Sequence, residues 1–212
     1  KINSKGRIPS KIGYFYPDTK NYHFQDSVKY TNESLMVTTD TLQFNYSEQK
    51  SYFFGTTKIK KDSVDIVSSY GWFHTKENIG YLHGDAMFKD PEKILFADTI
   101  FYNDSLQKIE AKKNVHFTEE KNNIRIQSNY LLKDESKEET FVSDCVLAEI
   151  IQESDTIYIH SDTLRILPDT TEDYKKLFAY HGVRIFNSQI QGSCDSLSFT
   201  EQIELMTLYK SP

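Results

Sequence analysis

A short pattern that recurs six times along the chain is the feature that most limits what this sequence can fold into. In each copy an apolar and a small residue precede Asp-Thr or Asp-Ser, or a variant of that pair, and more apolar residues follow. Four clear copies occupy residues 37–44 (VTTDTLQF), 95–102 (LFADTIFY), 159–166 (IHSDTLRI) and 195–199 (DSLSF). Two degenerate copies occupy residues 66–73 (IVSSYGWF) and 126–131 (IQSNYL). The Asp-equivalent positions are separated by steps of 29, 29, 31, 33 and 33 residues. Such even spacing predicts a repeat architecture.

A second pattern, in which a turn-forming or small residue precedes an apolar-x-apolar triplet, alternates with the first. Its copies occupy residues 27–30 (SVKY), 56–59 (TTKI), 85–88 (DAMF), 114–117 (NVHF), 145–148 (CVLA) and 182–185 (GVRI). Each repeat is therefore predicted to contain two strands of alternating polarity, separated by polar turns. The composition agrees, because the 14 Tyr and 14 Phe among 212 residues favour strands over helices.

The first pattern also predicts a change of direction within the strand. Its apolar residues lie three positions before the Asp and then two and four after it, and a gap of five residues reverses the face in a strand of period two. Either the backbone bulges there or the chain turns a corner at the small residue. We therefore expect an all-β fold, an elongated, twisted β-jelly roll or solenoid of about six two-stranded repeats with an apolar interior, and a closed β-sandwich is the alternative. Residues 1–24 are expected to form a lead-in and residues 25–212 a single repeat domain.

No motif of catalysis stands out. The sequence has no Gly-rich phosphate loop, no HExxH, no GxSxG and no CxxC, and its six histidines are scattered. His160, Ser161 and Asp162 are adjacent, but neighbours in a strand point to opposite faces and could not form a triad. We interpret the repeated Asp-Thr as a corner device whose side chain bonds nearby backbone, and not as a metal-binding ladder. The sequence therefore predicts a protein that is not an enzyme, with no metal site and no cofactor.

The net charge limits the class of binding partner, and the two cysteines raise the question of a disulfide. The net charge of −6 argues against a nucleic-acid partner, and no apolar stretch is long enough for a membrane-spanning helix. Cys145 and Cys194 could pair in an oxidising compartment or remain free, and the repeat register favours the free state because it does not place them opposite each other.

The alternation predicts which apolar side chains face the interior, and these are the candidate binding residues. They are Leu42, Phe44, Ile59, Phe73, Phe88, Ile100, Tyr102, Val115, Phe117, Leu131, Leu164, Ile166, Val183, Ile185, Leu197 and Phe199. An interior open along one side would shelter acyl chains, which gain about 0.8 kcal/mol per buried CH₂ group. A sealed interior would instead indicate a structural or protein-interaction module. Outward cations such as Lys29, Lys58, Arg165 and Arg184 are candidate contacts for lipid phosphates.

The repeated strand pair resembles the OstA-like family, which includes the LptA-like β-jelly-roll proteins of lipopolysaccharide transport. The likeness covers residues 25–210. Residues 66–73 with 80–84 (GYLHG), and 192–197 (GSCDSL) with Leu208 and Tyr209, are similar to the Bacteroidetes-type version. The chain departs from the family pattern at Ser69 and Asn129, which replace the repeated Asp, and in residues 132–157, where a longer acidic insertion is expected.

This resemblance implies a periplasmic protein of a Gram-negative bacterium that binds the lipid A part of lipopolysaccharide on its inner face. It also implies pairing with other transport components through exposed edge strands, and a possible head-to-tail homo-oligomer. The predicted last strand, residues 203–209, is apolar enough to serve as such an edge.

Overall fold

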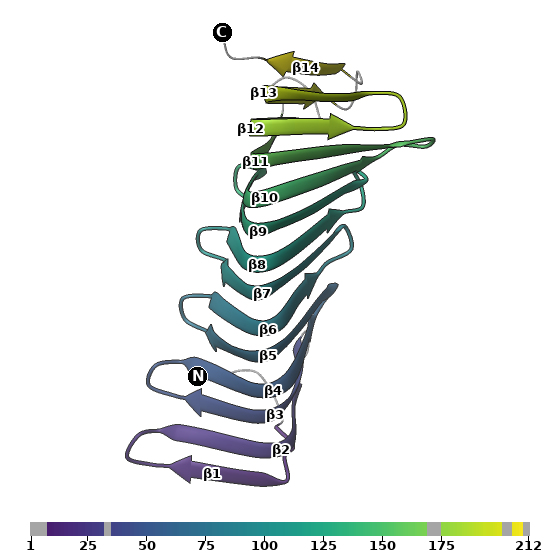
Figure 1. The fold of residues 1–212 in the computed structure, drawn as a ribbon. Coiled ribbons are helices and arrows are strands. Elements are labelled where there is room, and N and C mark those ends of the chain that lie inside the picture. Colours follow the sequence, from purple (N-terminus) through teal and green to yellow (C-terminus); the bar gives the residue numbers. More distant parts are fainter. Residues whose placement is uncertain (1–7, 32–34, 169–174, 201–204, 210–212) are drawn as a thin grey trace. The chain divides into compact units, whose positions relative to one another are not determined.

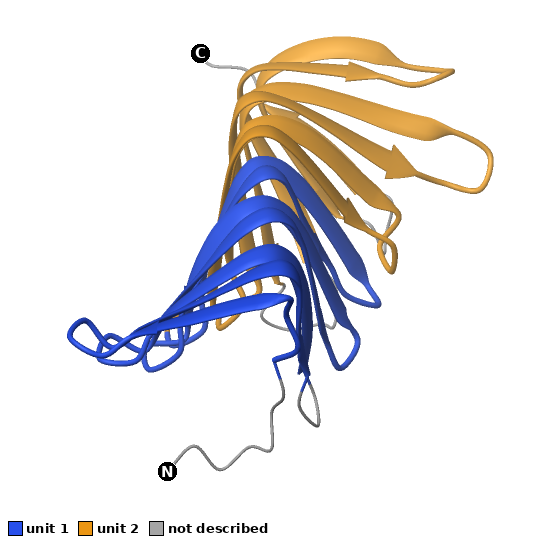
Figure 2. Ribbon diagram, turned by 90° about the horizontal axis from the view of Figure 1, so that it is seen from below, with its two compact units in different colours: residues 1–105 blue, residues 106–212 orange. Residues whose placement is uncertain are grey.

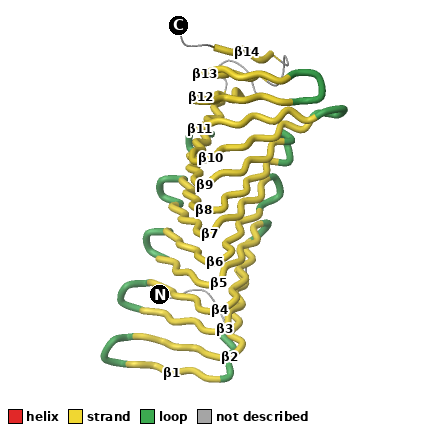
Figure 3. The backbone as a smooth tube through the Cα atoms, viewed as in Figure 1, coloured by secondary structure: helices red, strands yellow, loops and turns green. Residues whose placement is uncertain are grey.

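The computed structural model describes residues 8–31, 35–168, 175–200 and 205–209. Among these residues there are fourteen strands and no helix (Figures 1 and 3), so no helix that could cross a membrane is found there. The chain divides into two compact units, residues 1–105 and residues 106–212.

Unit 1 contains seven strands and unit 2 contains the other seven. Those of unit 1 are β1 (Ile12–Tyr16), β2 (Asn21–Thr31), β3 (Leu35–Asn45), β4 (Lys50–Lys61), β5 (Val64–His74), β6 (Ile79–Lys89) and β7 (Lys93–Asn103). Those of unit 2 are β8 (Lys108–Glu119), β9 (Ile124–Asp134), β10 (Glu139–Ile151), β11 (Thr156–Pro168), β12 (Lys175–Phe186), β13 (Gln191–Thr200) and β14 (Leu205–Tyr209).

Within each unit every strand pairs antiparallel with its neighbours in sequence. The six copies of the second pattern lie on the even-numbered strands β2 to β12, and the six copies of the first pattern lie on the odd-numbered strands β3 to β13. The predicted fold class is confirmed in this respect: an all-β fold of six two-stranded repeats, with an apolar interior in each unit.

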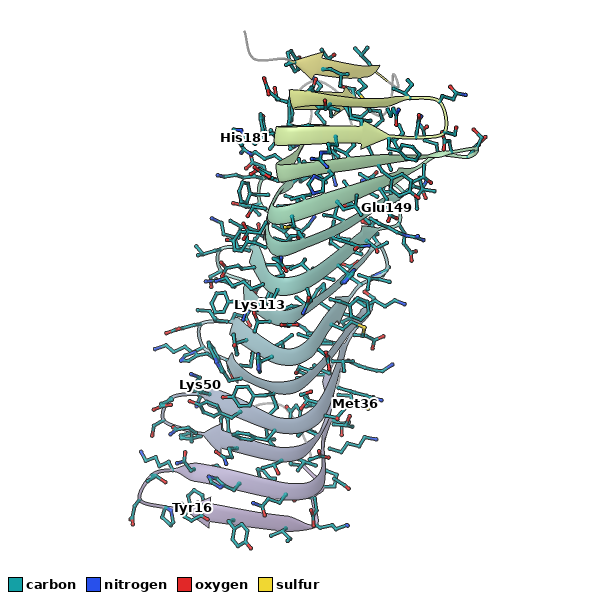
Figure 4. All side chains as sticks on the ribbon, in the orientation of Figure 1. Tyr16, Met36, Lys50, Lys113, Glu149 and His181 are labelled. Atoms are coloured by element: carbon teal, nitrogen blue, oxygen red, sulfur yellow. The ribbon has the colours of Figure 1, made fainter. Side chains whose placement is uncertain are left out.

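The predicted corner exists, and the extra residue that makes it lies in the second pattern rather than in the first. In each even strand from β2 to β12 two residues oppose one residue of a neighbouring odd strand, as between Gln25 and Val28 of β2, which pair with Thr41 and Thr39. One or both extra residues have positive φ in every copy, and Figure 4 labels two of them, Lys113 on β8 and His181 on β12. This is a β-bulge, which bends the strand and increases its twist. Figure 2 shows the resulting bend in the strands of both units.

The repeated Asp position is the single residue that faces each bulge. The Asp40 carboxylate lies against Gly55, whose φ is +82°, and Asn129 accepts a hydrogen bond through Oδ1 from the backbone N–H of Asn114 at 3.4 Å. These contacts support the interpretation of the repeated Asp as a corner device. The small residue before it lies inside the bend, where Ser161, for example, is fully buried.

The corner divides each long strand into two arms. We call arm A the one that ends at loops 46–49 and 75–78 in unit 1 and at loop 135–138 in unit 2. Arm B ends at loops 62–63 and 90–92 in unit 1 and at loops 120–123, 152–155 and 187–190 in unit 2.

Two sequence expectations differ from the structure, and a third falls partly outside the described residues. The predicted lead-in contains β1 and the start of β2, so paired strands begin earlier than expected. The expected acidic insertion at residues 132–157 is instead the end of β9, a four-residue loop at 135–138, the thirteen-residue strand β10 and the start of β11. The acidic residues continue the ladder, as in the pair Glu139–Asp134. The predicted last strand is described from Leu205 onward, and residues 203–204 lie outside the described residues.

Candidate functional site: the apolar inner face

The sixteen predicted interior side chains all lie on described strands, but the two units bury them differently. Eleven are buried: Leu42, Ile100, Val115, Phe117, Leu131, Leu164, Ile166, Val183, Ile185, Leu197 and Phe199. The other five are half-buried, and all of them belong to unit 1: Phe44, Ile59, Phe73, Phe88 and Tyr102. Every predicted interior residue of unit 2 is therefore covered, whereas the inner face of unit 1 keeps apolar side chains in partial contact with solvent.

The repeat makes this contrast direct, because equivalent positions can be compared. The third residue of each apolar-x-apolar triplet is half-buried at Tyr30, Ile59 and Phe88 in unit 1. The same position is buried at Phe117, Ala148 and Ile185 in unit 2.

The cores of the two units also differ in size. Among the described residues unit 1 buries nine apolar side chains and unit 2 buries twenty-one, although the units are similar in length. One core cluster of unit 1 consists of Val28, Val37, Leu42 and Phe53, around which half-buried Phe24, Tyr30, Ile59 and Phe73 pack. Its core therefore lies close to the corner and is bordered by partly exposed aromatic and aliphatic side chains.

In unit 2 a polar contact joins the ends of the two arms. The Lys175 Nζ, at the start of β12 in arm A, lies 3.1 Å from the Glu119 Oε1, at the end of β8 in arm B. Asn122 donates a hydrogen bond of 2.7 Å to the other carboxylate oxygen. The Lys133 Nζ, also from arm A, lies 5.5 Å from the ring centroid of Phe117 in arm B. We call Glu119, Lys133 and Lys175 the mouth cluster.

Glu119 is only 3% exposed, and its polar neighbours favour the charged form of its carboxyl group. Burial by itself raises the pKa of Glu119, but the Asn122 hydrogen bond and the positive charges of Lys175 and Lys133 together lower it below the ordinary value. The stabilisation from this shift is therefore present above the ordinary glutamate pKa and is lost as the pH falls through the lower, folded-state pKa.

Sequence reasoning missed the mouth cluster, although a signal for Lys133 was available. The position four residues after the repeated Asp is apolar in the other copies, as at Phe44, Tyr102 and Ile166, and Lys133 occupies it in the copy of β9. A lysine at an inward position, only 6% exposed, is the anomaly that marks this end of the interior.

The structure also places the histidine, serine and cysteine residues that the sequence analysis singled out. His160 is exposed whereas Ser161 is buried and donates its hydroxyl hydrogen bond to the Thr163 carbonyl at 3.0 Å, so the adjacent residues form no triad. No three His, Cys, Asp or Glu side chains of the described residues gather where they could hold a metal ion. Cys145 and Cys194 lie on the non-adjacent strands β10 and β13, and both are free.

The four outward cations suggested by the sequence are exposed on the side opposite the interior. Lys29 follows buried Val28, and Arg184 lies between buried Val183 and Ile185. Lys58 and Arg165 are likewise exposed, and the structure brings none of the four to the inner face.

The first and last described strands expose apolar side chains. In β1 these include Tyr14 and Phe15, which are 50% and 51% exposed, and in β14 they include Leu205 and Leu208, at 53% and 49%. Among the described strands β1 pairs with β2 alone and β14 pairs with β13 alone.

The chain is only distantly similar to known proteins. No protein-family model matches the sequence, and no curated protein is significantly similar to it. Among solved structures, one match is the crystal structure of LptH, the LptA-homologous periplasmic component of the lipopolysaccharide transport device from Pseudomonas aeruginosa. The two sequences are 10% identical, the match covers 66% of this chain and 82% of that chain, and the TM-score is 0.30. A similarity of this size does not establish a family or a function.

Proposed function

We propose that the protein is a non-catalytic carrier in the periplasm that holds the acyl chains of lipopolysaccharide against the inner face of unit 1. The observation that carries the proposal is the partial exposure of the five apolar inner residues, all of which belong to unit 1. A chain of about a dozen carbons buried there would gain on the order of 10 kcal/mol before entropic costs. The choice of lipopolysaccharide and of the periplasm rests on the resemblance of the repeat to the OstA-like family.

A matched pair of phenylalanines tests this inner-face site. Phe88 on β6 points inward and is half-buried, and Phe96 on the adjacent β7 points outward and is 45% exposed. With a photo-crosslinking phenylalanine analogue at one position at a time, we expect lipid A to crosslink at Phe88 at least tenfold more than at Phe96. Native mass spectrometry of the same mixtures should show a saturable adduct of lipid A mass. Equal crosslinking at both positions would contradict an inner-face site.

The buried interior of unit 2 favours a second role for that part of the chain, as a structural or interaction module. The apolar edges β1 and β14 fit such a role, because an unpaired strand edge can add a strand of another chain. We propose that these edges pair with other transport components or with further copies of this chain.

Substitution of an apolar edge residue should weaken such pairing. Leu208→Lys places a charge on β14, where strand addition would bury it, and we expect self-association in sedimentation velocity to fall at least tenfold. Ile190→Lys is the matched control, because Ile190 is 62% exposed in loop 187–190 and lies on no strand edge. An unchanged association constant in Leu208→Lys would exclude β14 as the pairing edge.

A further inference from the structure

The mouth cluster places charges at the end of the interior of unit 2, and most of the other buried side chains of that unit are apolar. Lys175 and Lys133 come from arm A, and both reach side chains of β8 in arm B, namely Glu119 and Phe117. Glu119 is separated from Lys175 by 56 residues in sequence, so the contact joins segments that no hairpin holds together.

An ion pair is a poor way to strengthen such a closure. Desolvation of two charges offsets most of their attraction, and apolar residues of similar volume are often as stabilising or more so. An ionic closure differs from an apolar one in a second respect, because another anion can take the place of the carboxylate. The incoming anion then becomes the counter-ion of the two lysines while the Glu119 carboxylate moves into solvent. The lysines are therefore not left as unpaired buried charges.

The site has two chemical parts that lie side by side. Its polar part consists of two ammonium groups, and Lys133 is buried against the Phe117 ring. Its apolar part consists of Phe117, Leu177 and Ile166, which are all at most 3% exposed and belong to the interior of unit 2. An anionic group attached to an alkyl chain matches both parts.

We propose that Lys133 and Lys175 bind the anionic headgroup of an amphiphile, which replaces the Glu119 carboxylate and admits the alkyl chain into the interior of unit 2. The proposal extends the proposed carrier function, on which it rests, from the open face of unit 1 to a second, gated site. The shared chemistry of the ligand is a phosphate or carboxylate on an alkyl chain.

Methyl NMR of the full chain, with isoleucine methyl groups labelled, can test this without a reporter mutation. Ile166 and Ile185 report on the interior of unit 2 and Ile100 reports on unit 1, and all three are at most 5% exposed. Dodecyl phosphate below its micelle concentration should shift the Ile166 and Ile185 signals in a saturable way. Dodecanol, which has the same chain and no charge, should leave them in place.

Variants then assign the effect to the mouth cluster. We expect Lys175→Gln to weaken the apparent affinity for dodecyl phosphate at unit 2 at least tenfold, and Glu119→Gln, which removes the competing charge, to strengthen it severalfold. Lys108→Gln is the matched control, because Lys108 pairs with Asp134 at 3.5 Å and both residues belong to arm A. It should change the affinity less than twofold.

The outcomes separate this inference from the proposed function. Equal shifts at Ile166 with dodecyl phosphate and dodecanol, or an unchanged affinity in Lys175→Gln, would overturn the gated site. Shifts confined to Ile100 would also overturn it while leaving the carrier function of unit 1 intact. The comparison of the two probes uses the unmodified protein, so it decides the question even if a variant fails to fold.

Discussion

Gly55→Ala is expected to destabilise unit 1 by about 3 kcal/mol, a large part of the 5–15 kcal/mol that is typical of a folded domain. Gly55 has a φ of +82°, in the region where a side chain costs about 1–2 kcal/mol. A Cβ added there would lie 2.7 Å from Asp40 Cγ and 2.8 Å from Asp40 Cβ, which is closer than carbon atoms can approach. The loss should appear as a lower midpoint in urea denaturation followed by circular dichroism.

Two other glycines separate the backbone effect from the steric effect. Gly182 also has positive φ, at +61°, but a Cβ there would meet nothing within 4 Å, so Gly182→Ala should cost only about 1 kcal/mol. Gly192 has neither constraint, and Gly192→Ala should be neutral or slightly stabilising. The double variant Asp40→Ala/Gly55→Ala should lose less unfolding free energy than the two single variants lose in total, because removing the Asp40 carboxylate relieves part of the clash with the new Cβ. Equal losses at all three glycines would contradict the assignment of Asp40 to the corner.

A charge at the third residue of the apolar-x-apolar triplet should have different effects in the two units. In unit 2 it should unfold the protein, and in unit 1 it should weaken lipid binding without unfolding. Ile185 and Phe88 are equivalent, each being the third residue of its apolar-x-apolar triplet, but Ile185 is 5% exposed and Phe88 is half-buried. Ile185→Glu would bury an unpaired carboxylate, which costs several kcal/mol, so we expect loss of the cooperative unfolding transition. Phe88→Glu can keep its charge in water, so we expect a folded protein whose lipid A adduct in native mass spectrometry falls at least tenfold.

Phe96→Glu is the matched control for Phe88→Glu, since Phe96 is an outward phenylalanine on the neighbouring strand. It should retain both the fold and the lipid adduct. If Phe88→Glu folds and binds lipid A as well as the parent protein, the inner face of unit 1 is not the binding site. Phe117→Glu would be less informative, because Phe117 is 3% exposed and a loss of binding there would accompany a loss of structure.

The direction in which a side chain of the site points could be predicted from the sequence, whereas the contacts between the two arms could not. Each strand carries its own alternation, so the inward direction of Phe88 or Leu164 follows from its neighbours two residues away. Whether an inward side chain is also covered depends on the opposite arm. The contact between Lys175 and Glu119 spans 56 residues and follows from no local pattern. Lys133 was visible as a charged residue at an apolar repeat position, but its partner across the mouth was not.

The sequence by itself determined the all-β class, the six two-stranded repeats and the inward set of side chains, because these follow from periodicity within and between neighbouring strands. It also showed that each repeat changes direction near the Asp position. Only the tertiary structure decided that the bulge lies in the strand beside the Asp, since register is a property of the pair and not of either strand. It likewise decided that unit 2 covers its interior while unit 1 leaves apolar side chains partly exposed, because burial depends on how closely the two arms approach.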